Sequence, residues 1–387
     1  MRFKNFDAEM FLRDHWQKQP LLIRNPWAVW VNPLEPDELA GLACEAEVES
    51  RLIEQTQGSL IAGIRAENGP FSAARFSKLG TDRWTLLVQG VDHYIPDVAA
   101  LIAPFRFIPN WRIDDVMVSL AADKGGVGPH FDQYDVFLIQ GLGRRRWQVG
   151  AKCDDMTALS PHDELRLLAE FEATDEWVLE PGDILYVPPG MSHNGVAVGD
   201  DCMTYSIGFR APSRADLIGN YCDDLLDKLS EDDRYGDAGL SRQENPGEIT
   251  ADALDALHLM ITEHLGDRAA FARWFGGYNS LPKYPDIDWT PEQPITISEL
   301  RERLIDGAPL VRNPASRFSY IDSAHDSVAF FADGAIFECA GPAAIMAKMI
   351  SAQDRFTIVP ELLKSDATLA IIAELFNQGS VAFDEAA

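Results

Sequence analysis

Residues 128–137, Gly-Pro-His-Phe-Asp-Gln-Tyr-Asp-Val-Phe, contain the pattern on which the interpretation of the chain depends. His130 and Asp132 are two positions apart, and on a strand such residues point to the same face. Another histidine, His193, follows a short apolar strand that ends at Pro-Pro-Gly. Two imidazoles and one carboxylate, with the opposite side of the metal left open, are the ligand set of non-haem Fe(II) oxygenases. The sequence therefore predicts an iron site made by His130, Asp132 and His193.

The expected local structure fits this site. Residues 113–120 form a strand-like run, and a Gly-rich loop follows at 123–129. The next strand is expected over residues 130–140, with a turn at 141–143. The order of Pro-Gly-Asp turn, strand, proline stop and histidine over residues 180–193 resembles the second motif of cupin barrels. Together the two motifs predict a double-stranded β-helix, although a loop histidine at position 193 that is satisfied by backbone groups is the alternative.

A second His-x-acid pair occurs at His162 and Glu164. It lies in residues 160–168, which have the Ser-Pro start and acidic first turn of a helix. We expect a helix there and no metal.

The basic run 144–146 follows the expected turn. Alternation along a strand sends Arg145 to one face and its two neighbours to the other. A buried guanidinium beside an iron site is costly unless an anion meets it, and a dicarboxylic cosubstrate such as 2-oxoglutarate would supply one. Arg145 is therefore the candidate partner of that carboxylate, with a structural salt bridge as the alternative.

Composition narrows the class of protein. The 387-residue chain has a formal net charge of -28, which argues against general affinity for phosphate backbones and would attract a basic macromolecule. Solubility alone is the other explanation of this charge. The five cysteines form no Cys-x-x-Cys, and neither a secretory h-region nor an apolar run of membrane-spanning length occurs. We expect a cytoplasmic protein without membrane contact.

The pattern changes from strands to helices after Pro212. Residues 213–285 show helical spacing, and packing on the chain's own barrel or on a second copy fits them equally well. Residues 286–387 have an order of helices and strands that resembles a winged helix. Residues 290–387 contain 7 Lys and Arg against 14 Asp and Glu, which is the wrong sign for a DNA-binding module. We expect no direct DNA binding.

Several stretches closely resemble the bacterial ribosomal oxygenases of the JmjC family. They are residues 111–119, 128–137 and 143–147, with further similarity at 11–24 and 203–212, so that essentially the whole chain is covered. The resemblance implies an α+β fold with three parts. These are a JmjC double-stranded β-helix at 1–212, a helical dimerisation segment at 213–285 and a winged-helix-like domain at 286–387.

The resemblance also implies an activity and its residues. His130, Asp132 and His193 would bind Fe(II), while Arg145, Ser119 and Ser206 would bind 2-oxoglutarate. The place of Ser206 depends on an expected loop at 194–201. With O2, the family hydroxylates a side-chain carbon of a ribosomal protein and releases succinate and CO2. The bacterial members act as homodimers on the β-carbon of an arginine in a basic large-subunit protein. Four residues near the mouth are candidates for holding that guanidinium, or are simply a solvated rim: Asp114, Asp115, Tyr134 and Asp135.

Other functions remain open from sequence. A hydroxylase of the same kind could act on histidine or asparagine. A cupin metalloenzyme that does not use 2-oxoglutarate is another possibility, against which a buried Arg145 argues. A non-catalytic ribosome-binding module would not need the complete ligand set.

Overall fold

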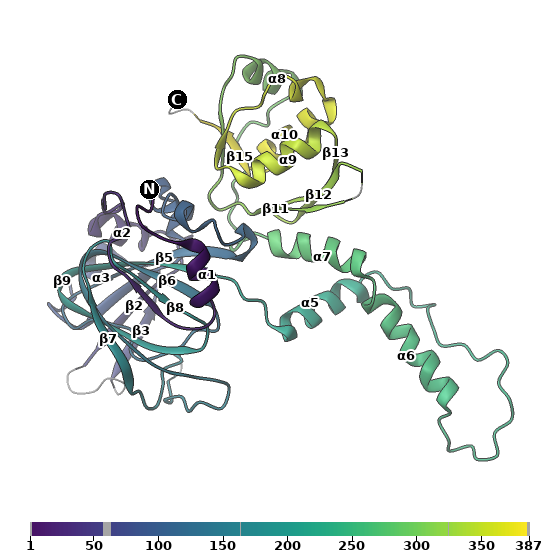
Figure 1. Ribbon diagram of the computed structural model, residues 1–387, viewed down its shortest axis with the longest axis horizontal. Coiled ribbons are helices and arrows are strands. Elements are labelled where there is room, and N and C mark those ends of the chain that lie inside the picture. The colour runs from purple at the N-terminus through teal and green to yellow at the C-terminus, as the bar shows by residue number, and fades with distance from the viewer. Residues whose placement is uncertain (1, 57–62, 163, 324, 385–387) are drawn as a thin grey trace. The chain divides into compact units, whose positions relative to one another are not determined.

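The computed structural model describes residues 2–56, 63–162, 164–323 and 325–384 (Figure 1). The chain divides into two compact units, Met1–Ala211 with Asn313–Ala315, and Pro212–Arg312 with Ser316–Ala387. None of the described helices is long and apolar enough to cross a membrane.

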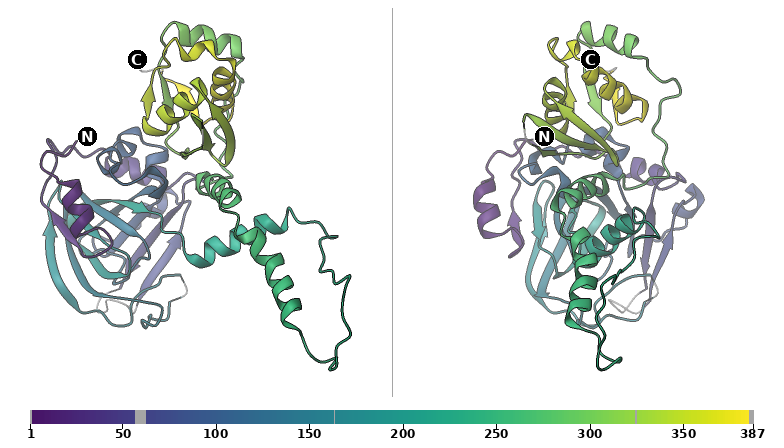
Figure 2. Two further views of the ribbon diagram at one scale, coloured as in Figure 1. Left: turned by 45° about the vertical axis from the view of Figure 1, so that its right-hand side comes forward. Right: turned by 90° about the vertical axis from the view of Figure 1, so that its right-hand side faces the viewer.

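The first unit is built on one antiparallel sheet that curves into a barrel (Figures 1 and 2). The hydrogen-bonded order is β1-β8-β6-β9-β5-β4-β2-β3, with β7 added to β6. The strands are β1 (Leu21–Ile23), β2 (Ser50–Gln55), β3 (Ile64–Asn68), β4 (Trp84–Val88), β5 (Ile113–Ala121), β6 (Asp135–Lys152), β7 (Ala173–Leu179), β8 (Ile184–Val187) and β9 (Met191–Phe209). The helices are short: α1 (Ala8–Asp14), α2 (Pro36–Leu42), α3 (Ala73–Phe76), α4 (Pro96–Ala99), and the 3-10 turns η1 (Val91–His93), η2 (Ala103–Phe105) and η3 (Asn110–Arg112).

The long strands β6 and β9 pair along nearly their whole length. This pairing contradicts two expectations from the sequence. No turn ends β6 at residues 141–143, and no loop interrupts β9 at 194–201. Instead the ladder shifts register between Gln140 and Arg144. Gly143 and Gly199 have φ angles of +58° and +83°, which glycine adopts at little cost, so each strand bends without ending.

The two faces of the sheet carry different cores. On the outer face, side chains such as Phe137 and Tyr205 pack with Phe11 and other residues of the N-terminal elements. On the inner face, Leu138 and Trp147 belong to a separate cluster that fills part of the barrel. This alternation is the pattern expected for strands buried on both sides.

The predicted helix at 160–168 is absent from the described residues around position 163. Leu159 and Leu168 form an isolated bridge, and His162 Nδ1 accepts hydrogen bonds from the amides of Glu164 and Leu165, both at 3.1 Å. His162 therefore organises a turn with its own ring.

The second unit begins with α5 (Arg214–Leu226), α6 (Ala251–Leu265) and α7 (Arg268–Ser280). Thr250 caps α6, accepting a hydrogen bond from the Ala253 amide. The remaining elements are α8 (Ile297–Ile305), β10 (Leu310–Arg312), β11 (Phe318–Asp322), β12 (Ser327–Ala332), β13 (Ala335–Ala340), α9 (Pro342–Ala352), β14 (Arg355–Phe356), η4 (Leu362–Lys364), α10 (Asp366–Asn377) and β15 (Val381–Phe383). They form two three-stranded sheets, β14-β10-β15 and β11-β12-β13, around one apolar core.

Candidate metal centre

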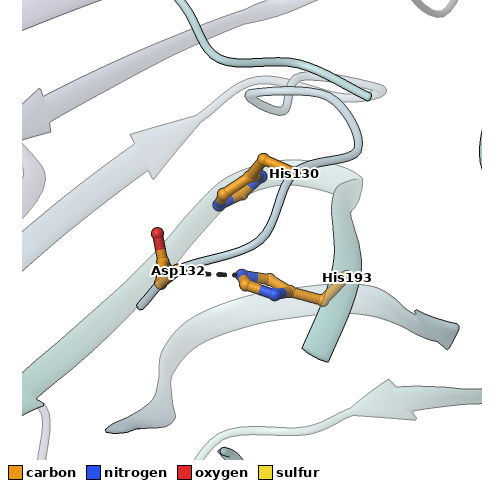
Figure 3. Close-up of side chains that lie close together, drawn as sticks. All are labelled: His130, Asp132 and His193. Atoms are coloured by element: carbon orange, nitrogen blue, oxygen red, sulfur yellow. Dashed lines mark ion pairs between the residues drawn. The ribbon is translucent and has the colours of Figure 1, made fainter. Parts of the chain in front are cut away.

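His130, Asp132 and His193 converge on one point inside the first unit (Figure 3). One possible ligand atom of each lies within 4.8 Å of the others. The Nε2 atom of His193 is 3.6 Å from an Asp132 carboxylate oxygen, and the two imidazole centroids are 4.3 Å apart. In the part of the chain that the structure describes, no other group of three or more such side chains has this geometry.

The backbone holds the two histidines side by side. The His130 amide donates to the His193 carbonyl at 3.0 Å, and the His193 amide donates to the His130 carbonyl at 2.8 Å. Asp132 lies beyond this bridge in a loop that is tied by the Gly190 amide at 2.6 Å. The expected strand from residue 130 is therefore wrong, because β6 begins only at Asp135.

Hydrogen bonds orient both imidazoles. The Nδ1 atom of His130 lies 2.8 Å from the Gly128 carbonyl, and that of His193 lies 3.0 Å from the Met191 carbonyl. A carbonyl partner places the proton on Nδ1 and leaves the Nε2 lone pair for a metal. Burial, with a smaller contribution from the nearby His130, lowers the pKa of His193 to about 4, so this ring is neutral at pH 7.

Arg145 points into the barrel from β6 and is only 3% exposed. Its Nε atom donates to Cys202 Sγ at 3.4 Å, and its guanidinium lies 5.7 Å from the centre of the Trp147 ring. The Nη2 atom is buried without a hydrogen-bond partner, and no ion pair to Arg145 occurs among the described residues. A buried cation with an unused donor fits an anionic ligand better than a structural salt bridge.

The two predicted serines lie on the same inner face as Arg145. Ser119 on β5 and Ser206 on β9 are 3% and 8% exposed. Ser119 lies opposite Thr204, and Ser206 lies opposite Met117 and Leu138. In the described chain, no hydrogen bond joins either hydroxyl to Arg145.

Of the predicted mouth residues, Asp135 is misplaced. It is fully buried and accepts hydrogen bonds from the Tyr186 hydroxyl at 2.6 Å and from the Gln17 side-chain amide at 3.0 Å. It also forms an ion pair with Arg112 at 3.1 Å. Its contacts belong to the outer face of the sheet. The sequence could have predicted this position, because Asp135 is two residues before Phe137 and therefore shares its outer face of the strand.

Of the other three mouth candidates, Tyr134 lies close enough to Asp132, Asp115 and Asp114 for their charges to act on its hydroxyl. Tyr134 is 43% exposed, and burial with the charges of Asp132, Asp115 and Asp114 raises the pKa of its hydroxyl well above the usual value. The hydroxyl therefore stays protonated and can donate a hydrogen bond to a neighbouring carboxylate. Asp115 is nearly buried and accepts from the Gly90 amide at 2.9 Å.

Sequence reasoning did not single out three inner residues near Arg145: Gln140, Trp147 and Cys202. Trp147 also lies 5.9 Å from the His193 ring, and its indole nitrogen is buried without a hydrogen-bond partner. Alternation from Arg145 would have placed Trp147 on the inner face. The other two depend on the bend, which the sequence did not show.

A barrel with an open His-Asp-His site and a buried, unpaired arginine defines a metal-dependent enzyme of the JmjC class. A family model described as "JmjC domain" matches residues 100–217, and one described as "ROXA-like winged helix" matches residues 263–382. A third, "AraC-like ligand binding domain", matches residues 172–270.

Whole-chain comparisons give a closer assignment. The chain is 42% identical over 302 residues to the "Ribosomal protein uL16 3-hydroxylase" of Escherichia coli (strain K12), covering 78% of this chain and 79% of that protein. It is 38% identical over 278 residues to a "Probable ribosomal oxygenase" of Haemophilus influenzae, covering 70% of this chain and 67% of the relative.

A solved structure of YcfD, described as a ribosomal oxygenase from Escherichia coli in complex with cobalt and 2-oxoglutarate, matches with a TM-score of 0.85. The sequences are 36% identical over 99% of each chain. The chain belongs to the ribosomal oxygenases of the JmjC family, which confirms the resemblance seen in the sequence.

Proposed function

We propose that this protein is an Fe(II)- and 2-oxoglutarate-dependent dioxygenase that hydroxylates the β-carbon of an arginine in the large-subunit ribosomal protein uL16. The convergence of His130, Asp132 and His193 inside the barrel is the observation that carries the proposal. Family membership and the name of the E. coli relative support the ribosomal substrate. The "3-hydroxylase" in that name supports the β-carbon, which is carbon 3 of an amino acid.

The donor set fits iron and its cosubstrate. Two imidazoles and one carboxylate would hold a divalent metal on one face and leave positions for two more ligands. Arg145, with Ser119 and Ser206 on the same face, would hold the distal carboxylate of 2-oxoglutarate. When bound, iron with 2-oxoglutarate and O2 supplies the oxidising power to place one oxygen atom on a C–H bond, with succinate and CO2 released.

The protein's own residues contribute position and exclusion of water. The inner cluster that includes Leu138, Trp147 and Leu185 lines the barrel with apolar atoms. Such a wall keeps bulk water from the reacting centre, while the fixed arginine aligns the cosubstrate. No acid or base is required among these residues, since the reaction on carbon needs none from the protein.

The charge of the chain supports a cationic target. The net charge of -28 favours approach of a basic ribosomal protein at low salt. Asp114, Asp115 and the candidate ligand Asp132 act on the Tyr134 hydroxyl, and such a group of acidic and hydrogen-bonding side chains would suit an arginine side chain. Histidine is the alternative target, because a mosquito relative that is 23% identical over 213 residues is named a histidyl-hydroxylase.

The decisive experiment combines product detection with target choice. Protein loaded anaerobically with Fe(II) is given 2-oxoglutarate, O2 and uL16 fragments in which each arginine or histidine is replaced singly. We expect succinate and a fragment heavier by one oxygen atom, with the modification lost for a single Arg→Lys fragment. His130→Ala should give neither product. Hydroxylation that persists in every arginine-substituted fragment would refute the arginine target, and absence of succinate would refute the activity.

A further inference from the structure

Arg145 points into the barrel because strand β6 bends just before it. The ladder with β9 shifts register between Gln140 and Arg144, with Gly143 in the left-handed region between them. Before the bend the inner residues are even-numbered, such as Leu138; after it they are odd-numbered, beginning with Arg145. A regular strand would have turned Arg145 to the outer face.

The side chain of Gln140 makes the hydrogen bonds that close this bend. It is fully buried, and its amide nitrogen donates to the carbonyls of Leu142 at 2.7 Å and Met203 at 3.2 Å. Its amide oxygen accepts from the Thr204 hydroxyl at 3.3 Å. The Gln140 amide nitrogen also lies 3.5 Å from Cys202 Sγ. One buried amide thus fastens β6 to β9 where their ladder is interrupted.

Cys202 links this amide to the guanidinium. Its sulfur is fully buried between the Gln140 nitrogen and the Nε atom of Arg145, at 3.5 and 3.4 Å. The guanidinium carbon of Arg145 also lies 5.7 Å from the centre of the Trp147 ring. The Nε atom of Arg145 is therefore held by the protein, while the Nη2 atom stays buried without a hydrogen-bond partner.

We propose that Gln140 and Cys202 are positioning residues for cosubstrate binding. They hold Arg145 in one orientation, so that its unpaired Nη2 meets the distal carboxylate of 2-oxoglutarate. This inference rests on the proposed function. A free arginine side chain has many rotamers, and a ligand that must order it binds more weakly than one that meets a pre-ordered group.

The experiment measures binding without turnover. Full-length protein is loaded with Mn(II) under anaerobic conditions, and dissociation constants are measured by calorimetry for 2-oxoglutarate and for 2-oxopentanoate, which lacks the distal carboxylate. The variants are Cys202→Ala, which removes the acceptor, Cys202→Ser, which keeps one, and Gln140→Met, which keeps the shape. Arg145→Ala is the positive control, and Cys222→Ala on α5 is the matched cysteine control.

We expect Cys202→Ala and Gln140→Met to weaken 2-oxoglutarate binding about threefold to tenfold, the effect of one hydrogen bond. Binding of 2-oxopentanoate should change by less than about twofold, because it makes no bond to Arg145. Cys202→Ser and Cys222→Ala should bind 2-oxoglutarate like the wild type.

Each other outcome counts against the inference. If Cys202→Ala and Gln140→Met bind 2-oxoglutarate as tightly as the wild type, the positioning role is refuted while the proposed function stands. Equal weakening of both ligands would show general damage to the barrel and would also refute positioning. A wild-type protein that does not bind 2-oxoglutarate overturns both, and thermal unfolding of each free variant shows whether Gln140→Met is folded.

Discussion

Asp132 is held differently from the two histidines that share its site. His130 and His193 are fixed by paired backbone hydrogen bonds, whereas Asp132 lies in a loop before β6. The Tyr134 hydroxyl can orient its carboxylate, because burial and the charges of Asp132, Asp115 and Asp114 raise the pKa of that hydroxyl and keep it protonated. A partner that orients a metal ligand commonly sets the metal affinity.

Tyr134→Phe should therefore weaken metal binding about tenfold, the lower end of the usual range for such partners, because the tyrosine is partly exposed. Mn(II) competition against a chelator measures the affinity directly. Tyr94→Phe is the control, since its hydroxyl bonds to the Glu47 carbonyl away from the site. Unchanged Mn(II) affinity in Tyr134→Phe would mean that the loop backbone alone fixes Asp132.

Sequence spacing predicted the convergence of the three candidate ligands better than it predicted their surroundings. His130 and Asp132 share a face although only His130 makes a strand-like bridge. Arg145 faces inward as predicted, but it does so because β6 bends and not because a turn precedes it. Alternation along a strand predicts that inner residues are two positions apart. It does not predict which set of residues faces inward, because this depends on long-range contacts such as the hydrogen bond from the Gln140 side-chain amide to strand β9.

The same limit applies to whole elements. Gly141-Leu142-Gly143 suggested a turn, yet glycines with positive φ can bend a strand whose partner continues beside it. The helices α6, α7, α9 and α10 were predictable because their apolar spacing extends over three or more turns. The strands β10, β14 and β15 have three residues or fewer, which is too few for any period to be seen in the sequence.

Helix α6 has no buried residue, although one of its faces is apolar. The exposed fractions of Leu254, Leu257, Ile261 and Leu265 are 53%, 42%, 61% and 43%, and their spacing of three or four places them in one stripe. A 15-residue helix is marginal in water without packing. We propose that a second copy of the chain covers this stripe in a homodimer.

The Leu257→Glu/Ile261→Glu variant should therefore be monomeric where the wild type is dimeric, because two carboxylates would be buried without partners. Light scattering after size exclusion measures the mass, with Thr262→Glu on the same helix as control. A monomeric wild type at tens of micromolar, a concentration at which a stable dimer interface would be occupied, would exclude this arrangement.

At the scale of the whole molecule, the chain has one apolar core in the second unit and several clusters in the first. The candidate metal ligands and the inner arginine all belong to the first unit. The second unit is acidic in its C-terminal part, with 7 basic against 14 acidic residues over 290–387, and so offers no counter-charge for DNA. This charge predicts a role in protein contact or structural support rather than in DNA binding.

Ligands should consequently stabilise the two units unequally. Mn(II) with 2-oxoglutarate at about a hundred times its dissociation constant stabilises a folded site by about 2.7 kcal/mol, which raises the unfolding midpoint of a unit of this size by roughly 5–10 °C. Scanning calorimetry should show the first unit's transition moving by this amount and the second unit's staying in place.

Labelling of Cys339 identifies the transition of the second unit. Burial raises the pKa of its thiol to about 11, so at pH 8 the folded protein resists iodoacetamide. When the unit unfolds, the pKa returns to about 8.5 and the thiol reacts. If Cys339 labelling moved to higher temperature together with the first transition, the two units would unfold as one, and the separation of their cores would have no thermodynamic meaning.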